Sequence, residues 1–320
     1  MKNPIFDLLH SVGVSALLRT TKKAQLTVLS LHRISDERDY FFDPISPKHF
    51  AALLEYCCKH YSLTSFGGLG EKTNKPKLIL SFDDGYRDFV EQALPIIRQY
   101  GVPCNHNLVN ACLNEGMVIW TQRMNDIFNF LKKNNIKDDE LIGKFEQQDA
   151  NNWIAYYVRF FRKMLAHSRE KRERILETLA LKYQIRSSYA MMTWDDARAC
   201  AQKFDVEIGC HTYHHDSLLN TTSEEYLAIE IGLSVQEMEQ NLGQKINILA
   251  LPNGQFNEKV ARYAESVGVK FLLLVDDCTT PMKQIHNGMN FISRIALVNE
   301  PPSAMLLRTE LFHARLKKIR

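Results

Sequence analysis

Residues 78–89 read LILSFDDGYRDF, and in this stretch a short apolar run leads directly into two adjacent carboxylates and a glycine. The run is typical of a buried β-strand, but buried strands do not normally end in paired acids. Adjacent carboxylates repel each other, and each is costly to remove from water. Asp83 and Asp84 therefore indicate either a plain turn or a site where a cation or a reaction retains both charges.

Seven apolar runs of strand length recur along the chain, and helical patterns separate most of them. One helix is predicted over residues 88–100 and another over 257–267, each followed by the glycine expected after a helix end. This alternation predicts a parallel sheet with both faces covered, either open or closed into a barrel. The predicted strands are residues 26–31, 77–82, 102–109, 206–210, 246–251, 269–275 and 291–298.

Residues 120–188 interrupt the alternation, because they show helical patterns and no strand. Trp153, Tyr157, Phe161 and either Met164 or Leu165 form an apolar side, and the opposite side is rich in Arg, Lys and Glu. Such a pattern is typical of packing and a solvated face rather than of a ligand platform. We therefore expect a single domain over residues 1–320 that carries a helical insertion at about 120–188.

The composition is that of a soluble globular protein, with 45% hydrophobic and 24% charged residues. The net charge of +3 gives no reason to expect nucleic acid as a partner. Seven cysteines without a CxxC pair are typical of reduced thiols in the cytosol. No apolar run approaches the length of a membrane span, and Asp7 and His10 interrupt the N-terminal apolar stretch, unlike a signal peptide. We therefore expect a cytoplasmic protein.

Polar and ionisable side chains stand where the predicted strands end, which is where α/β folds bind ligands. A single histidine at such a place is usually structural, and PNG is most often a plain turn. The combination of several such groups indicates a site more strongly than any one of them. The groups are His32, Asp83, Asp84, Asn105, His106, Asn107, His211, His214, His215, Asn253 and Arg294.

A carboxylate with two imidazoles is a good ligand set for Zn²⁺ or a similar divalent ion, with positions left for water and substrate. If the segment is helical, His211 shares a face with both His214 and His215, so the residues alone leave the second histidine open. The ion would stabilise both Asp83 and Asp84 as anions. One carboxylate could ligate, and the other could act as a base toward water acidified by the ion.

These motifs resemble the polysaccharide deacetylase family, carbohydrate esterase family four. LSFDDG is similar to the first family motif, T-F-D-D-G, and HTYHH after EIG is similar to the second, H-[ST]-x-x-H. ALPNGQFN resembles a variant of the third motif. The opening TVLSLHRIS resembles the circularly permuted branch that deacetylates poly-N-acetylglucosamine and exopolysaccharides. The resemblance covers about residues 25–120 and 190–300.

The resemblance implies a distorted (β/α)7 barrel, here with the helical insertion, and one divalent metal ion, most simply Zn²⁺. It also implies that the strand bearing the general acid comes first in the chain. The implied roles are Asp83 as general base, His32 as general acid, Asp84, His211 and His215 as metal ligands, and the backbone N–H of Asn253 as an oxyanion donor.

Two departures from the family pattern concern the substrate side of the site. The third motif usually has an arginine two residues before its proline to orient the base, where this chain has Ala250, and Arg294 is the candidate to replace it. The third strand is polar where the family is apolar, and Asn107 is a candidate oxyanion or substrate contact. Because side chains alternate along a strand, only Asn105 with Asn107, or His106, can face the barrel interior.

The implied activity is hydrolysis of the N-acetyl group of an amino sugar, in a saccharide or in a glycolipid or polysaccharide precursor. One alternative is a hydrolase of another non-peptide C–N bond in a small metabolite. A second is a non-catalytic carbohydrate-binding relative, against which the intact motif residues argue. The sequence identifies no oligomeric state.

Both chain ends read as amphipathic helices. At the N-terminus Ile5, Leu8, Leu9, Val12 and Leu17 share a side, and the C-terminal segment 304–320 combines an apolar stripe with basic residues up to Arg320. Such helices can contact an anionic membrane surface. We expect instead that both pack on the barrel, with peripheral contact at the inner membrane face as the alternative.

Overall fold

The computed structural model describes residues 4–145, 152–187, 189–219 and 223–317, and the chain forms two compact units. The barrel unit comprises the described parts of residues 1–36, 44–117 and 191–320. The helical unit comprises those of residues 37–43 and 118–190. The insertion expected at about 120–188 falls within the second unit.

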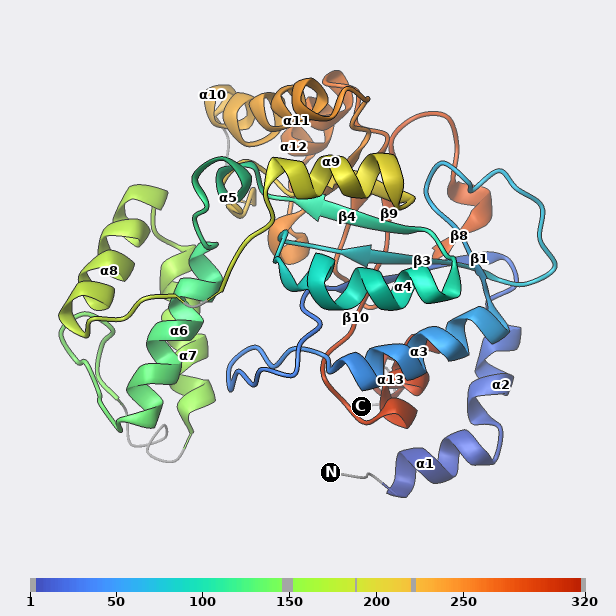
Figure 1. Cartoon of the computed structure of the whole chain (residues 1–320), viewed down its shortest axis with the longest axis horizontal. Coiled ribbons are helices and arrows are strands. Elements are labelled where there is room, and N and C mark those ends of the chain that lie inside the picture. Colours follow the sequence, from blue (N-terminus) through green and yellow to red (C-terminus); the bar gives the residue numbers. More distant parts are fainter. Residues whose placement is uncertain (1–3, 146–151, 188, 220–222, 318–320) are drawn as a thin grey trace. The chain divides into compact units, whose positions relative to one another are not determined.

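A parallel sheet forms the centre of the barrel unit (Figure 1). Its strand order is β10-β1-β3-β4-β5-β6-β7-β9, and all these neighbours pair in parallel. The strands are β1 (Gln25–Leu31), β3 (Lys77–Phe82), β4 (Cys104–Leu108), β5 (Val206–Cys210), β6 (Ile248–Ala250), β7 (Phe271–Leu273), β9 (Asn290–Ile292) and β10 (Ile295–Ala296).

The last two strands close the barrel. Only Ser293 and Arg294 separate β9 from β10, yet β9 pairs with β7 and β10 pairs with β1 at the other side of the sheet. The predicted run 291–298 is therefore one strand broken at these two residues. With β9 and β10 counted as one, seven parallel strands form the barrel, which confirms the predicted distorted (β/α)7 architecture.

The alternation of side chains along β1 and β3 divides the barrel interior from its outer layer. Leu26, Val28 and Ile79 belong to an apolar cluster with Ile248 and Leu273. The intervening residues of the same strands join the larger core shared with the surrounding helices. Both strands are buried on both faces, as expected in a parallel sheet. Ser81 and Asp83 follow Ile79 at a spacing of two, so the same alternation turns them inward.

Helices cover the outside of the strands, and α3, α4 and α9 lie along them in Figure 1. Ser46 caps α3, a Thr193–Asp196 capping box begins α9, and Gly101 ends α4 with a φ of 60°. The helices are α3 (Pro47–His60), the π-helix η1 (Phe89–Ala93), α4 (Leu94–Tyr100), α5 (Asn110–Glu115), α9 (Trp194–Lys203), α10 (Glu224–Leu227), the π-helix η3 (Ala228–Leu233), α11 (Ser234–Leu242), α12 (Glu258–Ser266) and the 3₁₀-helix η5 (Met282–Gln284).

Two short strands were not predicted. β2 (Ser62–Leu63) pairs with β3, and β8 (Thr280–Pro281) pairs antiparallel with β1. Each has two residues, which is too short for an alternating pattern to identify. The predicted helix 88–100 begins with the π-helix η1, whose wider turns a period of 3.6 residues does not reveal.

The helical unit contains α6 (Trp120–Lys133), α7 (Trp153–Leu165) and α8 (Arg169–Lys182). The fully buried positions of α7 are Tyr156, Phe160 and Met164, of which only Met164 was predicted for the apolar side. The other predicted residues flank this face and are partly buried, namely Trp153, Tyr157, Phe161 and Leu165. Residues 37–43 also join this unit, with Phe41 stacked on Tyr157 at a ring distance of 4.7 Å, a contact that the sequence pattern did not indicate.

The chain ends form α1 (Pro4–Ser11), α2 (Val14–Thr20), α13 (Pro302–Thr309) and α14 (Phe312–Lys317). The prediction of a single C-terminal helix over residues 304–320 is wrong, because Leu311 has a φ of 63° and separates α13 from α14. Met305 and Leu306 are buried in the core of the barrel unit and do not form an exposed stripe. Residues 318–320 lie outside the described residues.

None of the helices described is both long enough and apolar enough to cross a membrane.

Candidate metal centre and active site

The two adjacent carboxylates point in different directions. Asp83 continues β3, since its backbone N–H donates to the carbonyl oxygen of Leu31 at 2.9 Å. Asp84 leaves the strand with a φ of 78°, a left-handed conformation that is unusual for a residue other than glycine. The turn thus gives each acid its own environment.

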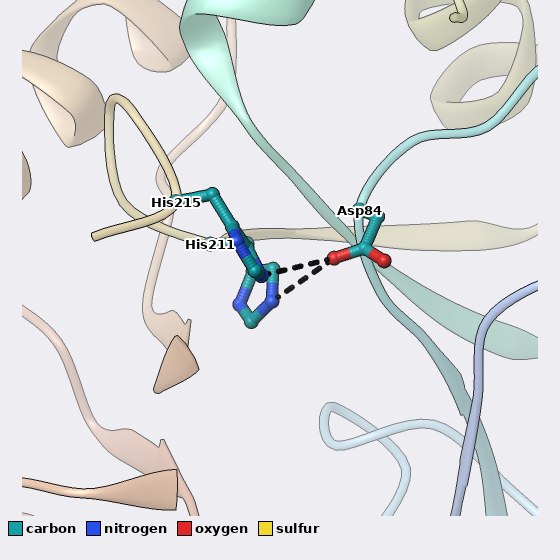
Figure 2. A group of neighbouring side chains, drawn as sticks. All are labelled: Asp84, His211 and His215. Atoms are coloured by element: carbon teal, nitrogen blue, oxygen red, sulfur yellow. Dashed lines mark ion pairs between the residues drawn. The ribbon is translucent and has the colours of Figure 1, made fainter. Parts of the chain in front are cut away.

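Asp84, which follows β3, lies close to two histidines that follow β5 (Figure 2). Its Oδ1 lies 3.4 Å from Nε2 of His211 and 3.3 Å from Nε2 of His215. All three side chains are buried, and their potential ligand atoms lie within 4.8 Å of one another. The sequence-predicted ligand set is therefore brought together in space.

The geometry of this group fits a divalent ion. Ligand atoms about 2.0–2.1 Å from a tetrahedral Zn²⁺ are about 3.3–3.4 Å apart, which is the separation of these oxygen and nitrogen atoms. Oδ1 of Asp84 is buried and accepts no hydrogen bond of ordinary geometry. Burial alone would raise the pKa of Asp84, but His211 and His215 lower it well below its usual range. The group thus presents a carboxylate oxygen and two imidazole nitrogens to one point.

A backbone carbonyl orients His211. Its Nδ1 lies 2.9 Å from the carbonyl oxygen of Ala250 on β6, which leaves Nε2 to face Asp84. Metal-binding histidines commonly make such a bond through their second nitrogen, because it sets the tautomer and the ring orientation. Ala250 therefore contributes its backbone at the position where the family motif usually has an arginine.

The loop after β5 separates His214 from His215. A shared helix face would require this segment to be helical, and it is not. Thr212 and His215 both adopt left-handed conformations, with φ of 64° and 60°. His214 turns away and its Nδ1 lies 2.6 Å from the buried carboxylate of Glu230. His215, and not His214, therefore faces Asp84.

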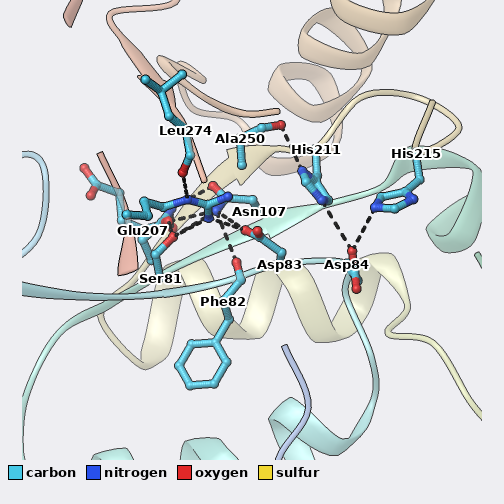
Figure 3. A network of polar contacts seen from close by, with 12 residues as sticks. Ser81, Phe82, Asp83, Asp84, Asn107, Glu207, His211, His215, Ala250 and Leu274 are labelled. Carbon is cyan, nitrogen blue, oxygen red and sulfur yellow. Dashed lines mark hydrogen bonds and ion pairs between the residues drawn. The ribbon is translucent and has the colours of Figure 1, made fainter. Parts of the chain in front are cut away.

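Arg294 and Asn107 hold the side chain of Asp83. Arg294 Nη1 donates to Asp83 Oδ1 at 2.8 Å. Asn107 Nδ2 donates to the same oxygen at 2.7 Å (Figure 3). Burial alone would raise the pKa of Asp83, but the Arg294 guanidinium and His211 lower it below its usual range. The carboxyl is therefore held ionised inside the barrel.

Arg294 contacts Asp83, as a replacement for the base-orienting arginine of the third motif would. Arg294 and Asn107 are both fully buried in the barrel interior. Asn105 faces the same interior, while His106 faces outward against Phe89. The two asparagines therefore lie side by side in the barrel interior, and Asn107 contacts Asp83.

His32 follows β1 and is half-buried beside the acid pair. Burial lowers the pKa of His32 below its usual value, although the carboxylates of Asp84 and Asp83 act in the opposite direction. The charges of both acids and of Arg294 act on this imidazole, so the side chain belongs to the same cluster.

Asn253 lies in the 3₁₀ turn η4 (Pro252–Gly254), directly after β6, and its side chain is exposed. Its φ of 59° is left-handed, and Gly254 follows with a φ of 66°. A Cβ at Gly254 would lie 2.6 Å from the backbone nitrogen of Val275, so only glycine fits there. Left-handed non-glycine residues therefore occur at Asp84, Thr212, His215 and Asn253, and such backbone strain is common at functional sites.

Comparisons with known proteins concern the family and the fold of the chain. The family model described as polysaccharide deacetylase matches residues 170–272, which include His211, His215 and Asn253. No curated protein sequence matches the chain.

Solved structures match over most of the chain. The Streptococcus pyogenes deacetylase PplD in complex with acetate has 16% identity and a TM-score of 0.59, over 89% of this chain and 98% of that chain. IcaB from Ammonifex degensii has 13% identity and a TM-score of 0.56, over 90% and 97%. A de-N-acetylase from Aggregatibacter actinomycetemcomitans has 17% identity and a TM-score of 0.51, over 86% and 95%.

The chain thus has the fold of these deacetylases, and residues 170–272 match the polysaccharide deacetylase family model, which confirms the resemblance predicted from the motifs.

Proposed function

We propose that this protein is a metal-dependent deacetylase that hydrolyses the N-acetyl group of an amino sugar in a polysaccharide or its precursor. The observation that carries the proposal is the buried group of Asp84, His211 and His215 beside a separately held carboxylate, Asp83. The family match over residues 170–272 and the fold shared with a de-N-acetylase support the same reaction class.

Asp84, His211 and His215 would hold the ion, and Zn²⁺ is the ion that this donor set suits best. A divalent ion there supplies a Lewis acid for the acetyl carbonyl and lowers the pKa of water toward neutrality. His211 is already oriented for this by the carbonyl of Ala250.

Asp83 acts as the general base in this proposal. Its Oδ1 is occupied by Arg294 and Asn107, while no described residue donates to Oδ2. Oδ2 therefore takes the proton from water as the water oxygen attacks the acetyl carbon. Arg294 keeps the carboxylate ionised, and so ready to accept, in spite of its burial.

The remaining steps fall to groups at two other strand ends. The backbone N–H of Asn253 donates to the oxyanion that develops on the acetyl oxygen. His32 gives a proton to the amine nitrogen as the C–N bond breaks, which releases acetate and the free amino sugar. Its half-buried position after β1 allows contact with a bound sugar.

Metal analysis and acetate release test the proposal together. We expect purified protein to carry one divalent ion per chain and to release acetate from at least one member of a panel of N-acetylated oligosaccharides. A matched sample stripped with a chelator should lose the activity and regain it with Zn²⁺. Metal-loaded protein that releases no acetate from any N-acetylated or O-acetylated saccharide would contradict a deacetylase.

A further inference from the structure

A buried side-chain amide lies beneath the candidate base. Asn107 is fully inaccessible to solvent, and its Nδ2 donates to Asp83 Oδ1 at 2.7 Å. The other partners of this nitrogen can also accept a hydrogen bond. A flipped amide would place its oxygen, which cannot donate, against the carboxylate. These partners are the Phe82 carbonyl oxygen at 3.1 Å, Ser81 Oγ at 3.1 Å and Asn105 Oδ1 at 3.0 Å.

A second asparagine fixes the first. Asn105 Nδ2 lies 3.1 Å from Asn107 Oδ1 and 3.0 Å from the carbonyl oxygen of Glu207, so its two donors have separate acceptors. Its Oδ1 accepts from Ser81 Oγ at 2.7 Å. Both ends of the Asn107 amide are occupied, so only the observed orientation places its NH2 toward the Asp83 carboxylate and its oxygen toward Asn105 Nδ2.

The neighbouring strand leaves room for this amide. Gly209 on β5 is the register partner of Asn107 on β4. A Cβ at position 209 would lie 2.2 Å from Asn107 Oδ1, closer than any side chain tolerates. The backbone conformation of Gly209 does not itself demand glycine, so the space is what requires it. The absence of a side chain at Gly209 therefore provides the space that the Asn107 amide occupies.

Two donors on one oxygen define the direction of a carboxylate. Arg294 and Asn107 both donate to Asp83 Oδ1, which fixes the rotation of the carboxyl group and leaves Oδ2 without a bond to any described residue. Arg294 also supplies a positive charge, whereas Asn107 is neutral. The amide therefore adds direction to the carboxylate without further changing the charge around it.

We propose that Asn107, held by Asn105 and Ser81, is a positioning residue that aims Oδ2 of Asp83 at the reacting water. This role rests on the proposed deacetylase function. It differs from the substrate or oxyanion contact expected from the sequence, because Asn107 acts through Asp83 and touches no substrate.

The variant Asn107→Leu removes the donor while keeping a similar volume. With a β-linked N-acetylglucosamine oligomer as the probe, we expect kcat to fall about 10- to 100-fold, as for other residues that orient a reactive group through a hydrogen bond. KM and metal content should stay at the wild-type values, because Asp84, His211 and His215 are untouched. An unchanged kcat, or a fall of kcat/KM that comes entirely from a higher KM, would refute the positioning role.

Asn290→Leu is the matched control. Asn290 is another buried asparagine of this barrel, at the first residue of β9, and it donates to the carbonyl oxygens of Lys270, His286 and Gly288. We expect this variant to lose stability like Asn107→Leu but to keep the wild-type kcat. An equal fall of kcat in both variants would show a general effect of disturbing the barrel and overturn the proposal.

The variant Asn107→Ser tests the same role if Asn107→Leu does not fold, and crystal structures test the orientation of the Asp83 carboxyl directly. Serine causes no overpacking, and its short side chain does not reach Asp83, so kcat should fall again if the leucine variant does not fold. A crystal structure of either variant should show the Asp83 carboxyl rotated away from its wild-type orientation; an unmoved carboxyl would refute the proposal. Wild-type protein without activity on any acetylated saccharide would count against the proposed function, and the crystal structures would still decide the role of Asn107.

Discussion

Arg294 Nη1 lies 2.8 Å from Asp83 Oδ1, although the two residues are 211 positions apart in the chain. Arg294 occupies the break between β9 and β10, where the last strand crosses from one side of the sheet to the other and closes the barrel. The same break therefore closes the barrel and places the Arg294 guanidinium beside the candidate base. Because both side chains are fully buried, each charge depends on the other.

Arg294→Met should destabilise the barrel and lower activity together. Removal of one partner from a buried ion pair leaves an uncompensated charge, which costs about 3–5 kcal/mol of unfolding free energy. Denaturant unfolding of the variant and wild type measures this loss. Arg38→Met is the control, because its ion pair with Asp43 is exposed and should contribute only about 0–1 kcal/mol. Equal stability losses in the two variants would contradict a buried ion pair.

The two adjacent histidines of the HTYHH segment should behave differently toward metal. His215→Ala removes a nitrogen that lies 3.3 Å from Asp84 Oδ1, and we expect the purified variant to lose most of its bound ion. His214→Ala removes a side chain that is hydrogen-bonded to Glu230, so the variant protein should retain the ion. Elemental analysis of the two purified variants decides between them. Metal loss from His214→Ala with retention in His215→Ala would reverse the assignment.

The variant Asp83→Asn distinguishes the role of the general base from that of the metal ligands. We expect the variant to bind metal as the wild type does, because Asp84, His211 and His215 are unchanged. Its kcat should fall about 10²- to 10⁴-fold, the usual range for the loss of a general base. Acetate release measures the fall and elemental analysis controls for the ion. Near-wild-type turnover would exclude Asp83 as the base.

Much of the site could be predicted from the sequence because strand ends and motif spacing are local features. The pairs Asp83–Asp84 and His211–His215 follow strands whose apolar runs are readily recognised, and parallel strands bring their carboxyl ends to one edge. The choice between His214 and His215 could not be made in this way. It depends on the left-handed conformations of Thr212 and His215 in a loop, and residue type alone does not show that a chain adopts such a conformation.

The polar interior beneath the site was harder to predict for a different reason. Alternation showed that Asn105 and Asn107 must share one face, but it could not show that this face is turned toward Asp83. The partner strands β3, β5 and the β9–β10 break lie far away in sequence, and no local pattern reports which side chains they contribute. Likewise, the place of residues 37–43 in the helical unit depends on tertiary packing of Phe41.

The burial of the C-terminal helix predicts a contrast between two leucines. Leu306→Ala should lower the unfolding free energy by about 2–5 kcal/mol, because Leu306 is 8% exposed and lies in the main core. Leu8→Ala should change it by less than about 0.5 kcal/mol, since Leu8 is 62% exposed. Thermal or denaturant unfolding measures both. A small effect of Leu306→Ala would mean that α13 does not pack on the barrel in solution.

Gly209 and Asn107 should be energetically coupled, because they compete for one space between β4 and β5. A Cβ at position 209 would lie 2.2 Å from Asn107 Oδ1, so Gly209→Ala should destabilise the protein by about 1–3 kcal/mol through overpacking. Asn107→Ala removes that oxygen and creates space for the new methyl group. The double variant should therefore lose less unfolding free energy than the sum of the two single variants, by about 0.5–3 kcal/mol. Ile248 lies 3.0 Å from the same point, so relief should be partial. Strictly additive losses in a denaturant-unfolding cycle would show that Asn107 does not occupy the space beside Gly209.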